Sequence, residues 1–159
     1  MLGRISDDVE VKASISEAWE VYNSAKIARI IQEELGYLFT VALVAGDGGI
    51  GTILQVTFRP GVSTLTPYKE KFTKIDHEKK RREIEIIEGG YLDDFGLTSC
   101  RVIIELIEKP NDKSSCIVRL SFEYEANEGL DLSNLNINLY LNSIKVINRS
   151  IEYETSKKV

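Results

Sequence analysis

The chain has 159 residues, of which 43% are hydrophobic and 28% are charged. This length and composition predict one folded domain with a sizeable core and exclude an intrinsically disordered chain. The net charge of −5 argues against a nucleic-acid partner, because a phosphate backbone selects basic surfaces. No apolar stretch approaches the ~20 residues that span a bilayer, and the opening residues lack the apolar segment of a secretory signal. We therefore expect a cytoplasmic protein without a membrane partner.

The first predicted elements are a strand and a pair of helices. Residues Asp8–Ala13 alternate polar and apolar side chains, as a half-buried strand does. Ser14 and Glu17 then stand at the spacing of a capping box, which marks the start of a helix. Apolar residues between Ile27 and Leu35 recur at helical spacing and predict a second short helix.

The middle of the chain is rich in β-forming residues and turn signals. The residues Asp47-Gly48-Gly49 stand between two β-rich runs and predict a hairpin, and a second hairpin turns at residues 76–79. The predicted strands of this part are Tyr37–Gly46, Gly51–Phe58, Tyr68–Ile75, Arg81–Glu88, Leu97–Ile107 and Cys116–Glu125. With the first strand they predict an antiparallel sheet of about seven strands, in which neighbours in sequence pair.

The last segment, Leu130–Tyr153, carries two conflicting patterns. Its stretch Asn134–Leu141, NLNINLYL, alternates with period two, as a strand does. A set of apolar residues along the whole segment instead fits one face of a helix: Leu132, Leu135, Leu139, Val146, Ile147 and Ile151. The segment is long and contains neither Gly nor Pro, which favours the helix.

The glycines between residues 46 and 51 suggest a phosphate-binding loop. A P-loop needs a Lys before its Ser or Thr and a helix after it, whereas here Gly51 directly precedes Thr52 and a predicted strand follows. The dinucleotide-binding fingerprint fails for the same reason. We therefore interpret the glycines as residues of a tight turn with positive φ, without a nucleotide.

Three motifs give the chain a resemblance to a known family. The glycine loop GDGGIGT at Gly46–Thr52, within this order of elements, resembles the class-ten pathogenesis-related proteins, the birch pollen allergen family. The motifs YKEKF at Tyr68–Phe72 and IEGGYLD at Ile87–Asp93 resemble the norcoclaurine synthases of plants. The resemblance covers nearly the whole chain. It implies an α+β helix-grip fold, in which a curved seven-stranded sheet wraps around a long C-terminal helix at Leu130–Tyr153 and encloses a ligand cavity.

Strand periodicity carries one acidic side chain toward the interior. In YKEKF, Tyr68 and Phe72 prefer the interior, and period two places Glu70 on the same face. Burial of this carboxyl group would raise its pKa, whereas a neighbouring cation would lower it.

The next strand supplies that cation in the prediction. Ile84 and Ile86 point inward and bring Arg82 to the same side, while Glu83 and Glu85 face water. With the hairpin turning near His77, Glu70 is expected opposite Ile84 and diagonal to Arg82, within reach of the guanidinium group. An exposed salt bridge at the rim of the sheet is the alternative interpretation.

The resemblance implies chemical roles for this group. Similar norcoclaurine synthases use a Tyr and a Glu at the positions of Tyr68 and Glu70, and the Glu acts as a base in condensing a phenolic amine with an aldehyde through an iminium. Their catalytic Lys falls on Arg82, which stays protonated and makes a poor proton shuttle. A second carboxylate of these enzymes falls near Val102. The candidate catalytic residues are therefore Tyr68, Glu70 and Arg82.

Other kinds of site find no support in the sequence. The only histidine, His77, and two separated cysteines lack the spacing of metal ligands. No Ser/His/Asp set can be assembled around a histidine in a turn. Cys100 and Cys116 are expected to be reduced and buried. We predict neither a metal nor a cofactor.

The sequence leaves two functions open, of which it favours the first. The first is a monomeric binding protein for a small aromatic metabolite, with an alkaloid or aromatic amine preferred because Glu70 suits a protonated amine, and a phytohormone or flavonoid next. The second is a cofactor-free enzyme that uses Glu70 and Tyr68 for acid–base chemistry, either condensation through an iminium or migration of a double bond. In both, the polar groups Tyr68, Glu70 and Arg82 share the cavity with apolar residues: Leu54, Phe72, Ile84, Ile86, Val102 and Leu139.

Overall fold

A computed structural model describes residues 1–158, which form seven strands and four helices. In chain order the elements are β1 (Leu2–Val11), α1 (Ile15–Tyr22), α2 (Lys26–Leu35), β2 (Phe39–Ala45), β3 (Ile53–Phe58), β4 (Tyr68–Asp76), β5 (Arg81–Gly89), α3 (Tyr91–Phe95), β6 (Leu97–Lys109), β7 (Asp112–Ala126) and α4 (Asn138–Ser156).

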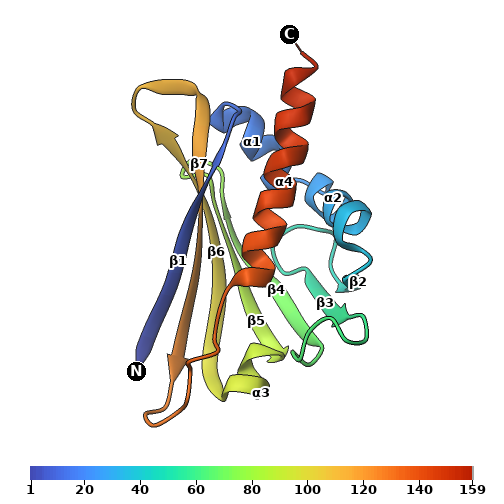
Figure 1. Cartoon of the computed structure of the whole chain (residues 1–159), viewed down its shortest axis with the longest axis vertical. Helices are drawn as coiled ribbons and strands as arrows, with labels where there is room; N and C mark the ends of the chain where they lie inside the picture. Colours follow the sequence, from blue (N-terminus) through green and yellow to red (C-terminus); the bar gives the residue numbers. More distant parts are fainter. Residues whose placement is uncertain (159) are drawn as a thin grey trace.

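The seven strands form one antiparallel sheet in the order β1-β7-β6-β5-β4-β3-β2. Strands β2 to β7 pair with their neighbours in sequence, and β1 closes the order beside β7. The helix α4 lies along one face of the twisted sheet, with α1 and α2 near its C-terminal half and α3 at the opposite end of the molecule (Figure 1). The predicted α+β architecture, a sheet packed with a long C-terminal helix, is confirmed.

The core lies between α4 and the inner face of the sheet. The strand β7 contributes Val118, Leu120 and Phe122, which are fully buried and two residues apart, as period two requires. The helix α4 contributes Ile144 and Ile147, which recur at helical spacing. Each such side chain stabilises the fold by about 1.5–3 kcal/mol, so the contact between β7 and α4 holds the helix against the sheet.

Two local predictions are confirmed by their hydrogen bonds. The side chain of Ser14 accepts from the backbone N–H of Glu17 at 3.2 Å, and the Glu17 carboxylate accepts from the N–H of Ser14 at 3.3 Å, which completes the capping box of α1. In the glycine loop, the N–H of Gly48 donates to the buried hydroxyl group of Thr52 at 2.8 Å, and Gly48 has a positive φ of 99°. This loop is a turn between β2 and β3.

The predicted C-terminal helix begins too early, because α4 starts at Asn138 rather than Leu130. Side chains in the intervening stretch bond to the backbone instead: Asp131 accepts from the N–H of Ser133, and Asn136 accepts from the N–H of Asn138, both at 3.0 Å. Such local bonds offer the chain an alternative to the helix. Residues 130–137 are therefore an irregular connection.

The first strand and the segment after β5 also differ from the prediction. The strand β1 covers Leu2–Val11 rather than Asp8–Ala13, because β7 offers a pairing partner along this whole length. The short helix α3 at Tyr91–Phe95 was not predicted, and it follows two glycines with positive φ that end β5. Within residues 1–158, no helix is long and apolar enough to cross a membrane.

Candidate functional site

The centre of the candidate site is Glu70, which β4 carries into the interior as predicted. Its side chain is 8% exposed, and it pairs with Leu54 of β3 and Ile86 of β5. The expected register is wrong here, because Glu70 lies opposite Ile86 and not Ile84. The turn between β4 and β5 lies between Asp76 and Arg81, further along the chain than a turn near His77, and this moves the partner of Glu70 toward the end of β5. An irregularity between Phe72 and Lys74 moves that partner back by one residue, and such a bulge leaves no signal in strand periodicity.

A tyrosine of α4 that the sequence analysis missed supplies the hydrogen bond to this carboxylate. The hydroxyl group of Tyr140 donates to Oε2 of Glu70 at 3.0 Å, and the hydroxyl group of Tyr68 lies 2.8 Å from that of Tyr140. A phenol has a single proton to donate. Because Tyr140 donates its proton to Glu70, Tyr68 donates to Tyr140, and the three side chains form one chain of hydrogen bonds.

Burial dominates the electrostatics of this chain. It raises the pKa of the Glu70 carboxyl group above its ordinary value, although the hydrogen bond from Tyr140 and the charge of Arg82 act in the opposite direction. Burial and the charge of Glu70 also raise the pKa of Tyr68 and that of Tyr140 well above the ordinary value. The two phenols therefore stay protonated, and Glu70 is the group of this chain that exchanges a proton most readily.

Aromatic rings enclose the hydrogen-bonded chain. The ring of Tyr91, from the IEGGYLD motif, meets the ring of Tyr68 edge-on at 5.9 Å and stacks on that of Tyr140 at 6.3 Å. Phe122 lies 5.0 Å from Tyr91, and Phe58 lies 6.5 Å from Tyr68. The phenol ring of Tyr140 thus lies among aromatic rings, and its hydroxyl group contacts the Glu70 carboxylate.

The structure assigns Arg82 a partner other than the predicted one. Its guanidinium group donates to the carbonyl oxygen of Tyr22 at 2.7 Å and lies over the ring of Phe72 at 4.6 Å. Arg82 is buried as expected, and burial lowers its pKa while Glu70 raises it. Among residues 1–158, however, it forms no ion pair with Glu70. Arg82 fastens β5 to the last residue of α1.

Tyr22 continues this connection through the core. Its own hydroxyl group donates to Oδ1 of Asn148 in α4 at 2.6 Å. The amide group of Asn148 in turn donates to the carbonyl oxygen of Glu10 in β1 at 3.5 Å. Polar bonds therefore join β5, α1, α4 and β1 beside the candidate site.

The other predicted site residues lie in or against the same core. Val102 is fully buried at the position where the resemblance places a carboxylate, so this wall of the site is apolar. The remaining predicted lining residues are buried, namely Ile84 and Ile86, or half-buried, namely Leu54, Phe72 and Leu139.

Three predictions outside the site need comment. Glu83 does not face water freely, because Arg81, Arg101 and Lys74 surround its carboxylate at 3.2, 2.9 and 3.9 Å. His77 is exposed as expected, yet its Nδ1 accepts from the indole of Trp19 at 3.2 Å. The predicted burial of both cysteines is confirmed: it raises the pKa of one thiol, Cys100, to about 12 and that of the other to about 11, so they are unreactive.

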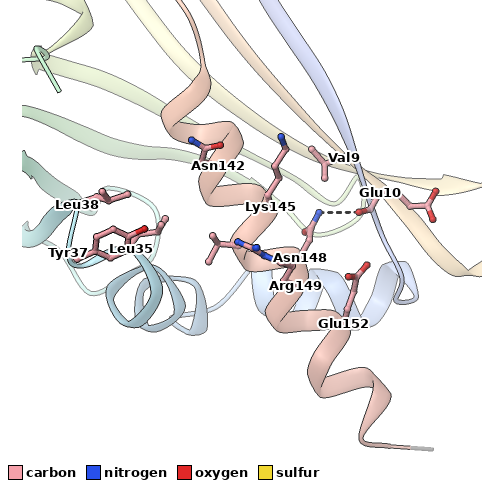
Figure 2. A pocket seen from close by; sticks show the side chains of 11 residues that line it. Val9, Glu10, Leu35, Tyr37, Leu38, Asn142, Lys145, Asn148, Arg149 and Glu152 are labelled. Carbon is pink, nitrogen blue, oxygen red and sulfur yellow. Dashed lines mark hydrogen bonds between the residues drawn. The ribbon is translucent and has the colours of Figure 1, made fainter. Parts of the chain in front are cut away.

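The described pockets do not coincide with the predicted cavity. One pocket, of about 510 Å³, lies between α4, β1 and the end of α2 (Figure 2). Another is lined by polar side chains of β1 and β7. Neither is lined by Tyr68, Glu70 or Arg82. The Glu70 carboxylate, to which a ligand was expected to bind, instead accepts a hydrogen bond from Tyr140.

Comparison with known proteins finds sequence similarity to two plant synthases. The chain is 36% identical over 129 residues to norbelladine synthase of Narcissus pseudonarcissus, a match that covers 80% of this chain and 77% of the relative. It is 41% identical over 127 residues to S-norcoclaurine synthase 1 of Papaver somniferum, covering 78% of this chain and 53% of the relative. The chain thus spans about half the length of that poppy protein.

Solved structures of a norcoclaurine synthase also match this chain. A point mutant of norcoclaurine synthase from Thalictrum flavum, in complex with a transition-state analogue, matches with a TM-score of 0.87 and 32% identity over 98% of this chain and 97% of that chain. The same synthase in complex with dopamine and hydroxybenzaldehyde matches with a TM-score of 0.82 and 31% identity over 95% of this chain and 87% of that chain. The profile of the Pathogenesis-related protein Bet v 1 family matches residues 1–154. The chain belongs to this family, as its fold and motifs had indicated.

Proposed function

We propose that the protein is a cofactor-free enzyme that condenses a phenolic amine with an aldehyde by acid–base chemistry at Glu70. The sequence alone favoured a binding protein over an enzyme. The similarity to proteins named norbelladine synthase and norcoclaurine synthase reverses this preference, as does the match to a synthase structure that contains dopamine and hydroxybenzaldehyde.

The buried carboxyl group of Glu70 is the observation that carries the proposal. Its raised pKa suits a group that must give up a proton and later accept one. The phenol of Tyr140 already lies against this carboxylate, between the aromatic rings of Tyr91 and Tyr68. A phenolic substrate that displaced Tyr140 would meet the same carboxylate and the same hydroxyl group of Tyr68.

The reaction proceeds in two proton-coupled steps. The amine nitrogen attacks the aldehyde carbon, and the protonated Glu70 gives its proton to the resulting hydroxyl group, which leaves as water and yields an iminium. A ring carbon of the amine then attacks the iminium carbon and forms a carbon–carbon bond. The proton displaced from that ring carbon passes to the Glu70 carboxylate, which restores the starting state. One water molecule is released and no electron acceptor is needed.

The neighbouring residues have supporting roles in this proposal. Tyr68 stays protonated and orients a phenol by its hydrogen bond. Arg82 keeps its charge and its bond to the carbonyl oxygen of Tyr22, so it contributes a fixed positive charge near Glu70 and moves no proton. The apolar Val102 excludes water from this side. Glu70 is thus the only residue here to which the proposal assigns proton transfer.

The direct test is turnover by purified protein supplied with dopamine and an aromatic aldehyde. Mass spectrometry detects the condensed product, and treatment with borohydride separates two isomers, because an open imine is reduced and a closed ring is not. The expected result is a closed-ring product from the wild type and a loss of at least about a hundredfold in rate for Glu70→Gln, the range typical of a general acid–base group.

A matched variant controls for the loss of one negative charge. Glu85 is exposed on the outward side of β5, and Glu85→Gln should keep the wild-type rate. An equal rate for Glu70→Gln and the wild type would refute the proposed role of Glu70. Saturable binding of the amine without any product would refute the enzyme and leave the binding protein as the function.

A further inference from the structure

The pocket beside α4 is a concave site that the proposed chemistry does not use. Its volume of about 510 Å³ lies within the range of small-molecule sites, about 300–1,000 Å³. Apolar side chains from three elements contribute to its lining, namely Val9 of β1, Leu35 of α2 and Val146 of α4. Figure 2 shows the lining residues of α4 between those at the end of α2 on one side and those of β1 on the other.

Two cationic side chains of α4 also line the pocket, and no residue that the structure describes pairs with their charges. Lys145 and Arg149 are exposed and lie one helical turn apart on α4, where like charges repel each other. In the described part of the chain, residues 1–158, neither of them forms an ion pair. An anion placed between them would relieve this repulsion.

The acidic residues of the pocket are already engaged by other groups. Glu10 forms an ion pair with Lys109 at 2.9 Å. Glu152 accepts a hydrogen bond from the backbone N–H of Lys12 at 2.8 Å. Their charges are therefore partly satisfied from outside, whereas the two cations of α4 remain available, although the chain as a whole is acidic.

We propose that this pocket is a second binding site, which takes a small aromatic carboxylate. The carboxylate contacts Lys145 and Arg149, and the planar guanidinium group offers it two parallel donors. The apolar part of the ligand packs against Leu35 and Val146, and the ring of Tyr37, which is 72% exposed at the edge of the pocket, covers it. The site is separate from Glu70, so it does not depend on the proposed enzyme activity.

The test uses naphthoate as the probe and follows amide NMR spectra of the whole protein. The expected result is saturable binding with shifts clustered on α4, on β1 and at the end of α2. The double variant Lys145→Gln/Arg149→Gln should weaken the affinity by at least about tenfold, which corresponds to about 1.4 kcal/mol. Naphthalenemethanol, which has the same ring system without the charge, should bind more weakly than naphthoate.

A second double variant controls for the change in net charge. Lys79 and Lys113 are exposed and do not line the pocket, so Lys79→Gln/Lys113→Gln should bind naphthoate like the wild type. Glu70→Gln should also leave this affinity unchanged. The proposal is overturned if both double variants bind equally, if the shifts cluster around Glu70 and Tyr91 instead, or if naphthoate does not bind up to its solubility limit.

Discussion

Replacing Glu70 with Gln should change how the free energy of unfolding depends on pH. Burial raises the pKa of the folded Glu70 carboxyl group above its ordinary value of 4.5, which the unfolded chain retains. Between these two pKa values the folded protein holds one proton more than the unfolded protein. The contribution of Glu70 to stability is therefore fully present below pH 4.5 and is lost as the pH rises through the folded pKa.

The size of the effect follows from this one proton. Through the window above pH 4.5, the wild type should lose up to about 1.4 kcal/mol of unfolding free energy per pH unit relative to Glu70→Gln. The amide of Gln stays neutral and can still accept from Tyr140, so the two proteins should differ little at lower pH. Above the folded pKa the difference should become constant, and the pH of that plateau reports the pKa itself.

Urea unfolding at a series of pH values measures this difference directly. All other titrating groups are common to both proteins, so their contributions cancel. The variant Glu85→Gln removes an exposed carboxylate in the neighbouring strand and controls for the loss of one negative charge. The wild type is expected to lose unfolding free energy relative to Glu70→Gln as the pH rises above 4.5. If it did not, the carboxylate would not be desolvated, and the argument for its proton-transfer role would fail.

Three further substitutions test the surroundings of Glu70. Tyr140→Phe removes the hydrogen bond to the carboxylate, so the unfolding free energy measured with urea at neutral pH should fall by about 2 kcal/mol. Calorimetry should show tighter binding of dopamine to this variant, because a competing phenol is lost. Arg82→Met leaves the carbonyl oxygen of Tyr22 without its donor and should cost about 2 kcal/mol by the same measurement; no loss would show that the bond is dispensable. Gly90 has a positive φ of 50°, and Gly90→Ala would place a methyl group 2.7 Å from the side chain of Tyr68. It should lower the melting temperature by several degrees more than Gly48→Ala, whose position is open.

Residue patterns over short stretches of the sequence were sufficient to predict much of the fold. The capping box of Ser14 and Glu17 and the glycine turn depend on residues a few positions apart, so their spacing is visible in the sequence. Period two likewise showed that Glu70 points inward, since alternation along a strand holds whatever the partner strand does.

The partners of the site residues could not be predicted in the same way. Tyr140 and Glu70 are 70 residues apart, and Arg82 and Tyr22 are 60 apart, so only the packed fold decides that they meet. The turn between β4 and β5 lies between Asp76 and Arg81, further along the chain than expected, and this displaced the register beside Glu70. Tyr140 did have one signal, because it is the single aromatic residue in NLNINLYL, but the irregular stretch before Asn138 hid which face of α4 it joins.

The bond between Arg82 and Tyr22 uses a main-chain oxygen, and this limits how mutation can affect it. Any amino acid at position 22 presents the same carbonyl group, so the anchor of the arginine survives every exchange there that preserves the end of α1. The phenol of Tyr22, by contrast, can be deleted on its own, which would release Asn148 and leave Arg82 in place. Tyr22 thus makes two attachments, and only the one through its side chain can be lost by substitution at this position. The attachment of Arg82, whose charge acts on Glu70, does not depend on which side chain stands there.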